Sequence, residues 1–136
     1  MRFFWGSSTH KIDAKGRVSI PAGFRRLLEK EEPLAVVLIP NLRGEPAIEG
    51  MTQGRFDALA SWVAKMGPLN RKARALAHKV LARARHIELE NTGRIVLGAD
   101  LGAAAGLTDS AHFVGLGGAF QIWDPATYET HYAEEL

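Results

Sequence analysis

The stretch IDAKGRVSIPAGF, residues 12–24, decides the local fold of this chain. Apolar residues alternate at Val18 and Ile20, which is typical of a strand with one buried face. Residues 13–16 carry the acid and the glycine of a tight turn before this strand, and Pro21 after it suits the first turn of a helix. The elements predicted from this stretch are a β-hairpin, with strands at 9–12 and 17–20, and a helix that follows Pro21.

The same pattern returns 77 residues later, as LENTGRIVLGADL from Leu89. The matching positions are Asp13 with Glu90, Gly16 with Gly93, Arg17 with Arg94, and Ile20 with Leu97. Each copy is followed by a predicted strand pair, LAVVLIP with AIEGM in the first and AHFVGLGGAFQIWD in the second. One copy alone has few strands and exposed sheet edges, so we expect the two copies to interlock around a pseudo-twofold axis.

The segment between the copies is predicted to be helical. FDALASWVAKM and RKARALAHKVLARARH are rich in alanine with periodic apolar positions, and Gly67-Pro68 separates them into an αα-hairpin. From Lys65 to Arg85 the chain has seven Lys or Arg and no acid, whereas six acids and no Lys or Arg follow Arg94. This basic run indicates either a polyanionic partner or a solvated helix face. Because its charges spread around the helix predicted over 71–85, we favour a supporting linker.

Composition excludes several classes of protein. A chain of 136 residues with 46% apolar residues is long enough for one packed domain, and the absence of cysteine excludes disulfides and thiolate chemistry. No apolar run approaches the roughly 18 residues of a membrane span, and the first residues lack the apolar stretch of a signal peptide. We therefore expect a cytoplasmic protein with no membrane partner. A closing helix is predicted in PATYETHYAEEL.

Catalytic and metal-binding patterns are not evident. The five histidines lack a paired ligand spacing, and no serine, acid and histidine set or glycine elbow indicates a nucleophile. GLGGAF, residues 115–120, is interpreted as a hairpin turn, since no GK[ST] follows it. We expect no enzyme, no metal, no cofactor and no small-molecule substrate. The three tryptophans are predicted to fill the core or subunit contacts, and the apolar start MRFFWG to be buried against the fold or a neighbouring subunit.

KIDAKGRVSIPAGFRRLL resembles the swapped-hairpin module of the AbrB family of bacterial transcription regulators. Tandem modules joined by a basic helix, the QIWD element and the acid-x-x-x-Arg motif of residues 13–17 resemble the MraZ family, regulators of the bacterial division and cell-wall gene cluster. The resemblance covers nearly the whole chain. It implies an α+β fold, a pseudo-twofold swapped-hairpin β-barrel built from two AbrB-like repeats with flanking α-helices. The expected divisions are a first repeat at 1–65, a basic linking helix at 66–85 and a second repeat at 86–136, which together form one intertwined domain.

The resemblance also implies that the surface around the hairpin binds double-stranded promoter DNA. Lys15 and Arg17 can reach phosphates, and an arginine fork can also bind guanine in the major groove. Asp13 and Gly16 are predicted to support the turn and orient Arg17. Arg17 itself has two open interpretations, a contact with DNA or a structural pair with Asp13. The other predicted contacts in this copy are Arg25, Arg26 and His10.

The second copy departs from the pattern. Arg94 is kept, with Glu90 and Gly93 as its predicted turn support, but the positions of Lys15, Arg25 and Arg26 are occupied by Thr92, Gly102 and Ala103. Arg94 is therefore expected either to add a DNA contact or to act as a structural clasp. The first copy is expected to supply most of the phosphate contacts.

The function expected from these features is sequence-specific regulation of transcription, by a nucleoid-associated homo-oligomeric ring on repeated promoter boxes. Several subunits would supply affinity by counterion release. Two alternatives are an antitoxin-like AbrB-fold regulator and an assembly or interaction ring without specific DNA binding.

Overall fold

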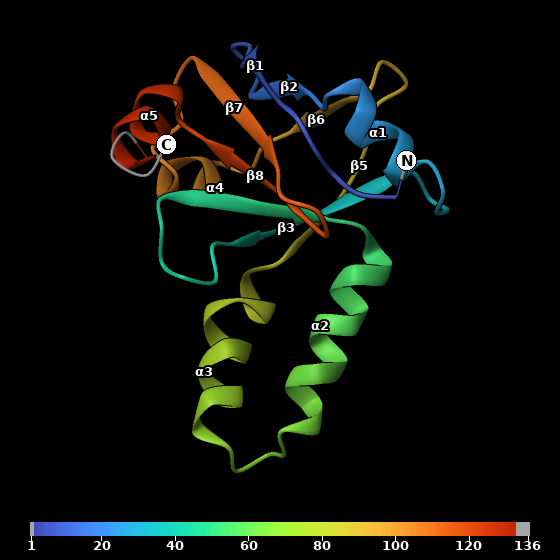
Figure 1. Ribbon diagram of the computed structural model, residues 1–136, viewed down its shortest axis with the longest axis vertical. Coiled ribbons are helices and arrows are strands. Elements are labelled where there is room, and N and C mark those ends of the chain that lie inside the picture. Colours follow the sequence, from blue (N-terminus) through green and yellow to red (C-terminus); the bar gives the residue numbers. More distant parts are fainter. Residues whose placement is uncertain (1, 133–136) are drawn as a thin grey trace.

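The computed structural model describes residues 2–132 and has the predicted α+β composition (Figure 1). The first half contains β1 (Ser7–Lys11), β2 (Arg17–Ser19), α1 (Ala22–Leu28), β3 (Ala35–Pro40), β4 (Ala47–Met51) and α2 (Gln53–Lys65). The second contains α3 (Arg71–Lys79), a 3₁₀ turn (Leu81–Arg83), β5 (Arg85–Glu88), β6 (Arg94–Val96), α4 (Ala99–Ala104), β7 (Ser110–Gly115), β8 (Phe120–Trp123) and α5 (Pro125–Tyr132). Among these helices, none has the length and apolarity needed to cross a membrane.

The strands form a six-stranded antiparallel sheet in the order β1-β7-β8-β4-β3-β5 and a separate two-stranded ribbon of β2 and β6. Most pairings join the two halves of the chain, because β1 pairs with β7, β5 with β3, β2 with β6 and β4 with β8. Exchanging β1–β4 with β5–β8 leaves this pattern of pairs unchanged. The two halves are therefore interlocked and related by pseudo-twofold pairing.

Two details of the prediction are wrong. The strands expected at 9–12 and 17–20 exist with shifted ends, but beyond one closing bond, from Asp13 N–H to Arg17 C=O at 3.0 Å, they diverge. Each then pairs with a strand of the other half rather than with its neighbour. The expected closed barrel is an open sheet, because β1 and β5 form its two edges while β2 and β6 pair as strands only with each other.

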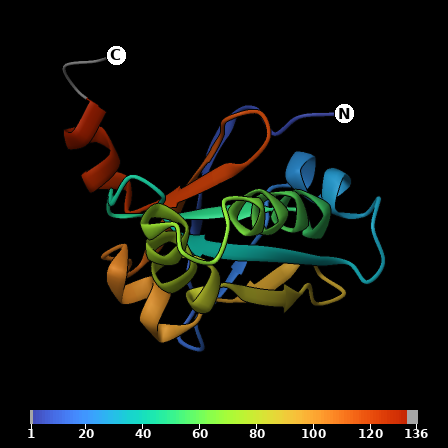
Figure 2. The same ribbon diagram turned by 90° about the horizontal axis from the view of Figure 1, so that it is seen from below.

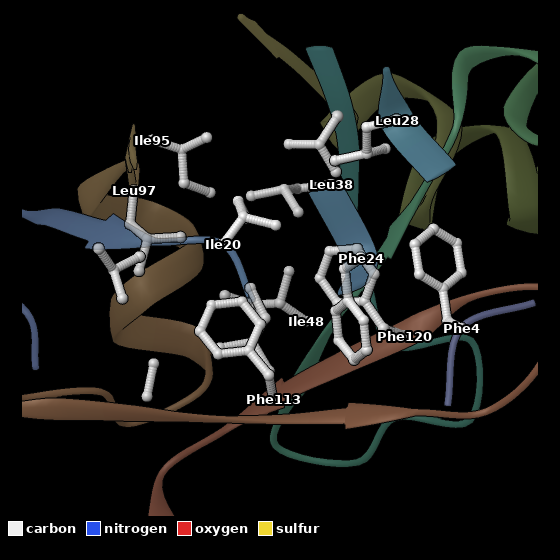
Figure 3. Packing of buried hydrophobic residues seen from close by; sticks show 14 of the residues in the cluster. Phe4, Ile20, Phe24, Leu28, Leu38, Ile48, Ile95, Leu97, Phe113 and Phe120 are labelled. Carbon is white, nitrogen blue, oxygen red and sulfur yellow. The ribbon is translucent and has the colours of Figure 1, made fainter. Parts of the chain in front are cut away.

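The main core lies between the sheet and the β2–β6 ribbon, and Figure 3 shows its packing. Val18 and Ile95, at the centres of β2 and β6, are fully buried. Helix α1 buries Phe24, Leu27 and Leu28 at helical spacing. Phe24 contacts Phe4 edge-to-face, with ring centroids 5.4 Å apart. Because both halves supply these side chains, neither half has a complete core without the other.

Helices α2 and α3 lie side by side and project from the sheet in Figure 1, and Figure 2 shows them across β3. They explain why β3 is apolar throughout, since Val37 and Ile39 face a second cluster while Val36 and Leu38 face the main core. The αα-hairpin and the β3–β4 and β7–β8 strand pairs agree with the prediction.

The basic helix expected over 71–85, within the 66–85 linker, is shorter than predicted. It ends at Lys79, and Val80, the C-cap residue with φ −119°, buries its side chain beside Val37. Arg85 already belongs to β5 and pairs with β3. The free energy gained by burying Val80 and by pairing β5 with the sheet edge exceeds the free energy gained by extending α3.

The aromatic residues behave unequally. Trp123 and Phe4 are buried, as expected, but Trp5 and Trp62 are 67% and 57% exposed. Phe3 is also exposed, so the apolar N-terminal segment is only partly covered by this chain.

Candidate nucleic-acid interface

The β2–β6 ribbon presents two arginines on one face. Arg17 pairs in register with Val96, and Ser19 pairs with Arg94. Because the intervening Val18 and Ile95 are fully buried, the four flanking side chains occupy the opposite, outward face. Arg17 and Arg94 are therefore diagonal neighbours across the ribbon. Figure 1 shows this ribbon at the end of the molecule opposite to α2 and α3.

The first turn holds Arg17 through Asp13. Oδ1 of Asp13 accepts the backbone N–H groups of Lys15 and Arg17, both at 2.9 Å, and Oδ2 accepts Nε–H of Arg17 at 2.7 Å. Gly16 supplies the φ of +79° that the turn requires. These bonds, led by the Arg17 backbone N–H, lower the pKa of Asp13 to about 2. Asp13 is thus ionised across the physiological range, and its two oxygens bond the backbone and the side chain of Arg17.

The second turn is less tightly bonded. Gly93 has φ +84°, and its N–H donates to the Glu90 carbonyl at 2.8 Å. Arg94 Nε lies 3.1 Å from Glu90 Oε1 and donates to the Thr92 hydroxyl at 3.0 Å. Within residues 2–132 the longer Glu90 side chain makes no bond to the backbone N–H groups of its own turn. Replacing Asp by Glu therefore keeps the ion pair and loses the backbone bracing.

The two turns are joined through the ribbon. Leu97 N–H donates to the Gly16 carbonyl at 2.9 Å, and Ile20 N–H donates to the Gly93 carbonyl at 3.0 Å. The Asp13 hydrogen bond raises the pKa of the Arg17 guanidinium, and the charge of Glu90 adds to this effect. Two arginines and two carboxylates thus alternate on one small surface. The exposed Lys15 adds positive charge beside it.

Helix α1 places its two arginines differently. Arg26 is exposed, whereas Arg25 lies against the second turn and its Nη2 donates to the Asn91 carbonyl at 3.3 Å. Arg25 Nε lies 3.1 Å from Glu29 Oε1 on the same helix. The pair therefore does not form one uniform basic surface. The contact with Asn91 was not predicted, since α1 reaches that turn only because β2 pairs with β6 of the other half.

His10 is half-buried on β1, a strand that pairs with β7 and not with the ribbon. Its ring packs edge-to-face on Phe113 with centroids 5.5 Å apart, and its Nε2 lies 2.9 Å from the Ser8 hydroxyl. Burial lowers the pKa of His10, which favours the neutral ring. Its predicted phosphate contact is still a proposal.

The outward face also contains two residues that the sequence prediction did not include. Ser19 and Val96 lie between the arginines, and Val96 is 48% exposed. The alternation of buried and exposed positions in the two strands was the signal that could have identified them. In the described part of the chain, no three His, Asp or Glu side chains are grouped to hold a metal ion.

These features define a class of protein, an α+β chain whose interlocked halves present two acid-oriented arginines on a shared ribbon. The chain belongs to the MraZ family: the family model described as "MraZ protein, putative antitoxin-like" matches residues 3–62 and 80–136. A protein named "Transcriptional regulator MraZ" from Gluconobacter oxydans is 40% identical over 92% of this chain and 77% of its own length.

Two further relatives carry the same name. The protein from Gluconacetobacter diazotrophicus is 38% identical over 98% of this chain and 86% of its own length. The protein from Rhodospirillum rubrum is 37% identical over 95% of this chain and 84% of its own length. The predicted family is thereby confirmed.

Proposed function

We propose that this protein is a sequence-specific DNA-binding transcription regulator that uses the outward face of the β2–β6 ribbon. The observation that carries the proposal is the diagonal pair of Arg17 and Arg94, each held by an acid four residues earlier. An arginine fixed through Nε keeps its two terminal nitrogens at the outer end of the side chain. That fork matches phosphate oxygens or the O6 and N7 atoms of guanine.

Positive charge beside the ribbon extends the contact to the DNA backbone. Lys15 and Arg26 are both exposed, and Arg25 adds charge although its guanidinium contacts the second turn. Phosphate contacts position the protein, while the two ribbon arginines select bases. The pseudo-twofold arrangement of the turns suits a DNA site in which the protein contacts both DNA strands in similar ways.

Assembly would multiply these weak contacts. Phe3, Trp5 and Leu116 are 60%, 67% and 57% exposed, and the Phe4–Gly117 bridge brings the N-terminal segment beside the tip of the β7–β8 hairpin. A solvent-exposed group of large apolar side chains favours contact with another protein surface. We propose that it joins subunits into a ring that binds repeated promoter boxes of the division and cell-wall gene cluster at the nucleoid.

The family description, "putative antitoxin-like", favours one second candidate, an antitoxin-like regulator. Such a protein would also bind a toxin partner. A small toxin gene beside the coding sequence would favour this candidate, whereas neighbouring cell-wall genes would favour the first.

The direct test is binding of the purified protein to the DNA upstream of its own coding sequence. We expect a footprint over repeated boxes, a preference over a shuffled duplex, and an affinity that falls steeply as salt rises. Size-exclusion chromatography with light scattering measures assembly in parallel. Equal affinity for the shuffled duplex at every salt concentration would contradict specific recognition, and an oligomer without DNA binding would leave the assembly ring as the function.

A further inference from the structure

The two turns of the ribbon differ in how they are braced. In the first, both Asp13 Oδ1 bonds go to backbone N–H groups, so the turn is braced from within. In the second, Glu90 pairs with Arg94 but leaves the equivalent N–H groups of Thr92 and Arg94 without such a bond in the described structure. A turn that positions an arginine for recognition needs some other constraint on its backbone.

Arg25 lies where such a constraint would act. Its Nη2 donates to the Asn91 carbonyl, and a Cβ atom placed on Gly93 would lie 2.7 Å from its Nη1. The guanidinium thus covers Gly93, which is buried, whereas Gly16 at the equivalent place is only half-buried. Glu29 Oε1 lies 3.1 Å from Arg25 Nε on the other side of the guanidinium, as an ion pair without hydrogen-bond geometry.

The Arg25 contact has no counterpart at the pseudo-symmetric position in the other half. The residue that corresponds to Arg25 in α4 is Gly102, which has no side chain to reach the first turn. A Cβ atom on Gly16 would meet only the Leu97 carbonyl, at 3.5 Å. The first turn has the internal brace of Asp13 and no external arginine. The second turn lacks such a brace and has Arg25.

We propose that Arg25 is a positioning residue, which clamps the 90–94 turn of the other half and so orients Arg94. It does from outside what Asp13 does from inside the first turn. The consequence for DNA binding rests on the function proposed above, whereas the clamp itself is a property of the free protein. Arg25 would therefore affect binding mainly through Arg94, unlike its exposed neighbour Arg26.

Amide hydrogen exchange measured by NMR tests the clamp without DNA. The reporters are the N–H groups of Gly93 and Gly16, which donate to the carbonyls of Glu90 and Asp13. We expect R25A and R25K to accelerate exchange at Gly93 about tenfold and to leave Gly16 unchanged, since lysine keeps the charge but lacks the planar fork. R26A is the matched control and should change neither amide. Equal Gly93 exchange in R25A and R26A would overturn the proposal.

Restoring an internal brace provides the second test. Glu90→Asp places in the second turn the acid that braces the first, so R25A/E90D should return Gly93 exchange to within about twofold of the wild type. If the double variant is folded and Gly93 exchange stays fast, the proposal that Arg25 replaces an internal acid brace is overturned. Thermal unfolding of each variant verifies that it is folded.

DNA affinity separates this proposal from the proposed function. If both hold, the effects of R25K and R94A on affinity are less than additive, whereas those of R26A and R94A add. Weaker DNA binding by R25K with unchanged Gly93 exchange would make Arg25 a direct contact and overturn the clamp. If the wild type binds no DNA, the proposed function fails while the exchange experiment still decides the clamp.

Discussion

Asp13 holds Arg17 at two points, since one carboxylate oxygen accepts its backbone N–H and the other accepts its Nε–H. The turn and the side chain are therefore fixed by the same group. A structural role and a ligand-binding role for Arg17 do not exclude each other, because an Nε bond leaves the terminal nitrogens of the fork for a second partner. The pairing is therefore compatible with the proposed DNA contact of Arg17.

Arg17→Ala should abolish the preference for promoter DNA and leave the oligomer unchanged, because the variant removes the fork of the better braced turn. Arg94→Ala should cause a smaller loss of about tenfold, since one well-placed arginine contact contributes about 1–3 kcal/mol. Fluorescence anisotropy at several salt concentrations measures both, and light scattering verifies assembly. Wild-type affinity and specificity in R17A would refute the assignment.

Acid stability should report on Asp13. Its pKa falls from the ordinary 3.8 to about 2 in the folded protein, so the unfolded chain binds the proton more readily. The stabilisation is fully present above pH 3.8 and is lost as the pH falls toward 2. Asp13→Asn cannot titrate, so its stability should depend less on pH in this window. Denaturant unfolding at intervals of pH measures the difference, and parallel curves for the two proteins would contradict it.

Much of the fold was predictable because its signals are local. The alternation at Val18 and Ile20, the turn at residues 13–16 and the repeat at Leu89 predicted strands, turns and two related halves. The acid, glycine and arginine at fixed offsets likewise indicated the turn chemistry around Arg17. These patterns depend on neighbouring residues or on a comparison of the chain with itself, so no tertiary information was needed.

What could not be predicted depends on contacts between distant residues. The pairing of β1 with β7, rather than with β2, is decided by which partner completes the core, and both choices satisfy the same alternation. Arg25 shows the same limit at the site, since its contact with Asn91 joins positions 66 residues apart. An RR pair in the sequence contains no information that one arginine faces another turn.

Two glycines should respond to alanine in opposite directions. Gly50 in β4 lies opposite Phe120, and a Cβ atom there would overlap the phenylalanine ring, so Gly50→Ala should destabilise the fold by about 1–3 kcal/mol. Gly102 in α4 has open space around it, so Gly102→Ala should stabilise by about 0.5–1 kcal/mol through helix propensity. Chemical denaturation measures the free energy of unfolding of both variants. Tolerance of alanine at position 50 would show that Phe120 moves aside readily.

Glu49 provides a test of charge inside the sheet, on the β4–β8 pairing that joins the two halves. Its Oε1 accepts from Nδ2 of Asn41 and Nε2 of Gln121, each at 3.0 Å. Burial raises the pKa of Glu49, the Gln121 bond opposes this, and the nearby Glu45 raises it further. The folded state therefore binds the proton more readily than the unfolded chain, and ionised Glu49 costs stability above its raised pKa.

Glu49→Gln keeps the accepting oxygen and removes the charge. At pH 8 it should raise the free energy of unfolding by about 0.5 kcal/mol, a small gain because the side chain is partly exposed, and the difference should narrow as the pH falls toward 4. Glu49→Ala is the contrasting variant: it removes the acceptor that the Asn41 and Gln121 amides share, leaving Asn41 only its longer bond to Glu45 at 3.4 Å, and should cost about 1–3 kcal/mol at both pH values. Denaturant unfolding at pH 8 and pH 4 distinguishes these effects. A Gln variant that is less stable at pH 8 and equal to the wild type at pH 4 would show that the carboxylate charge strengthens the network.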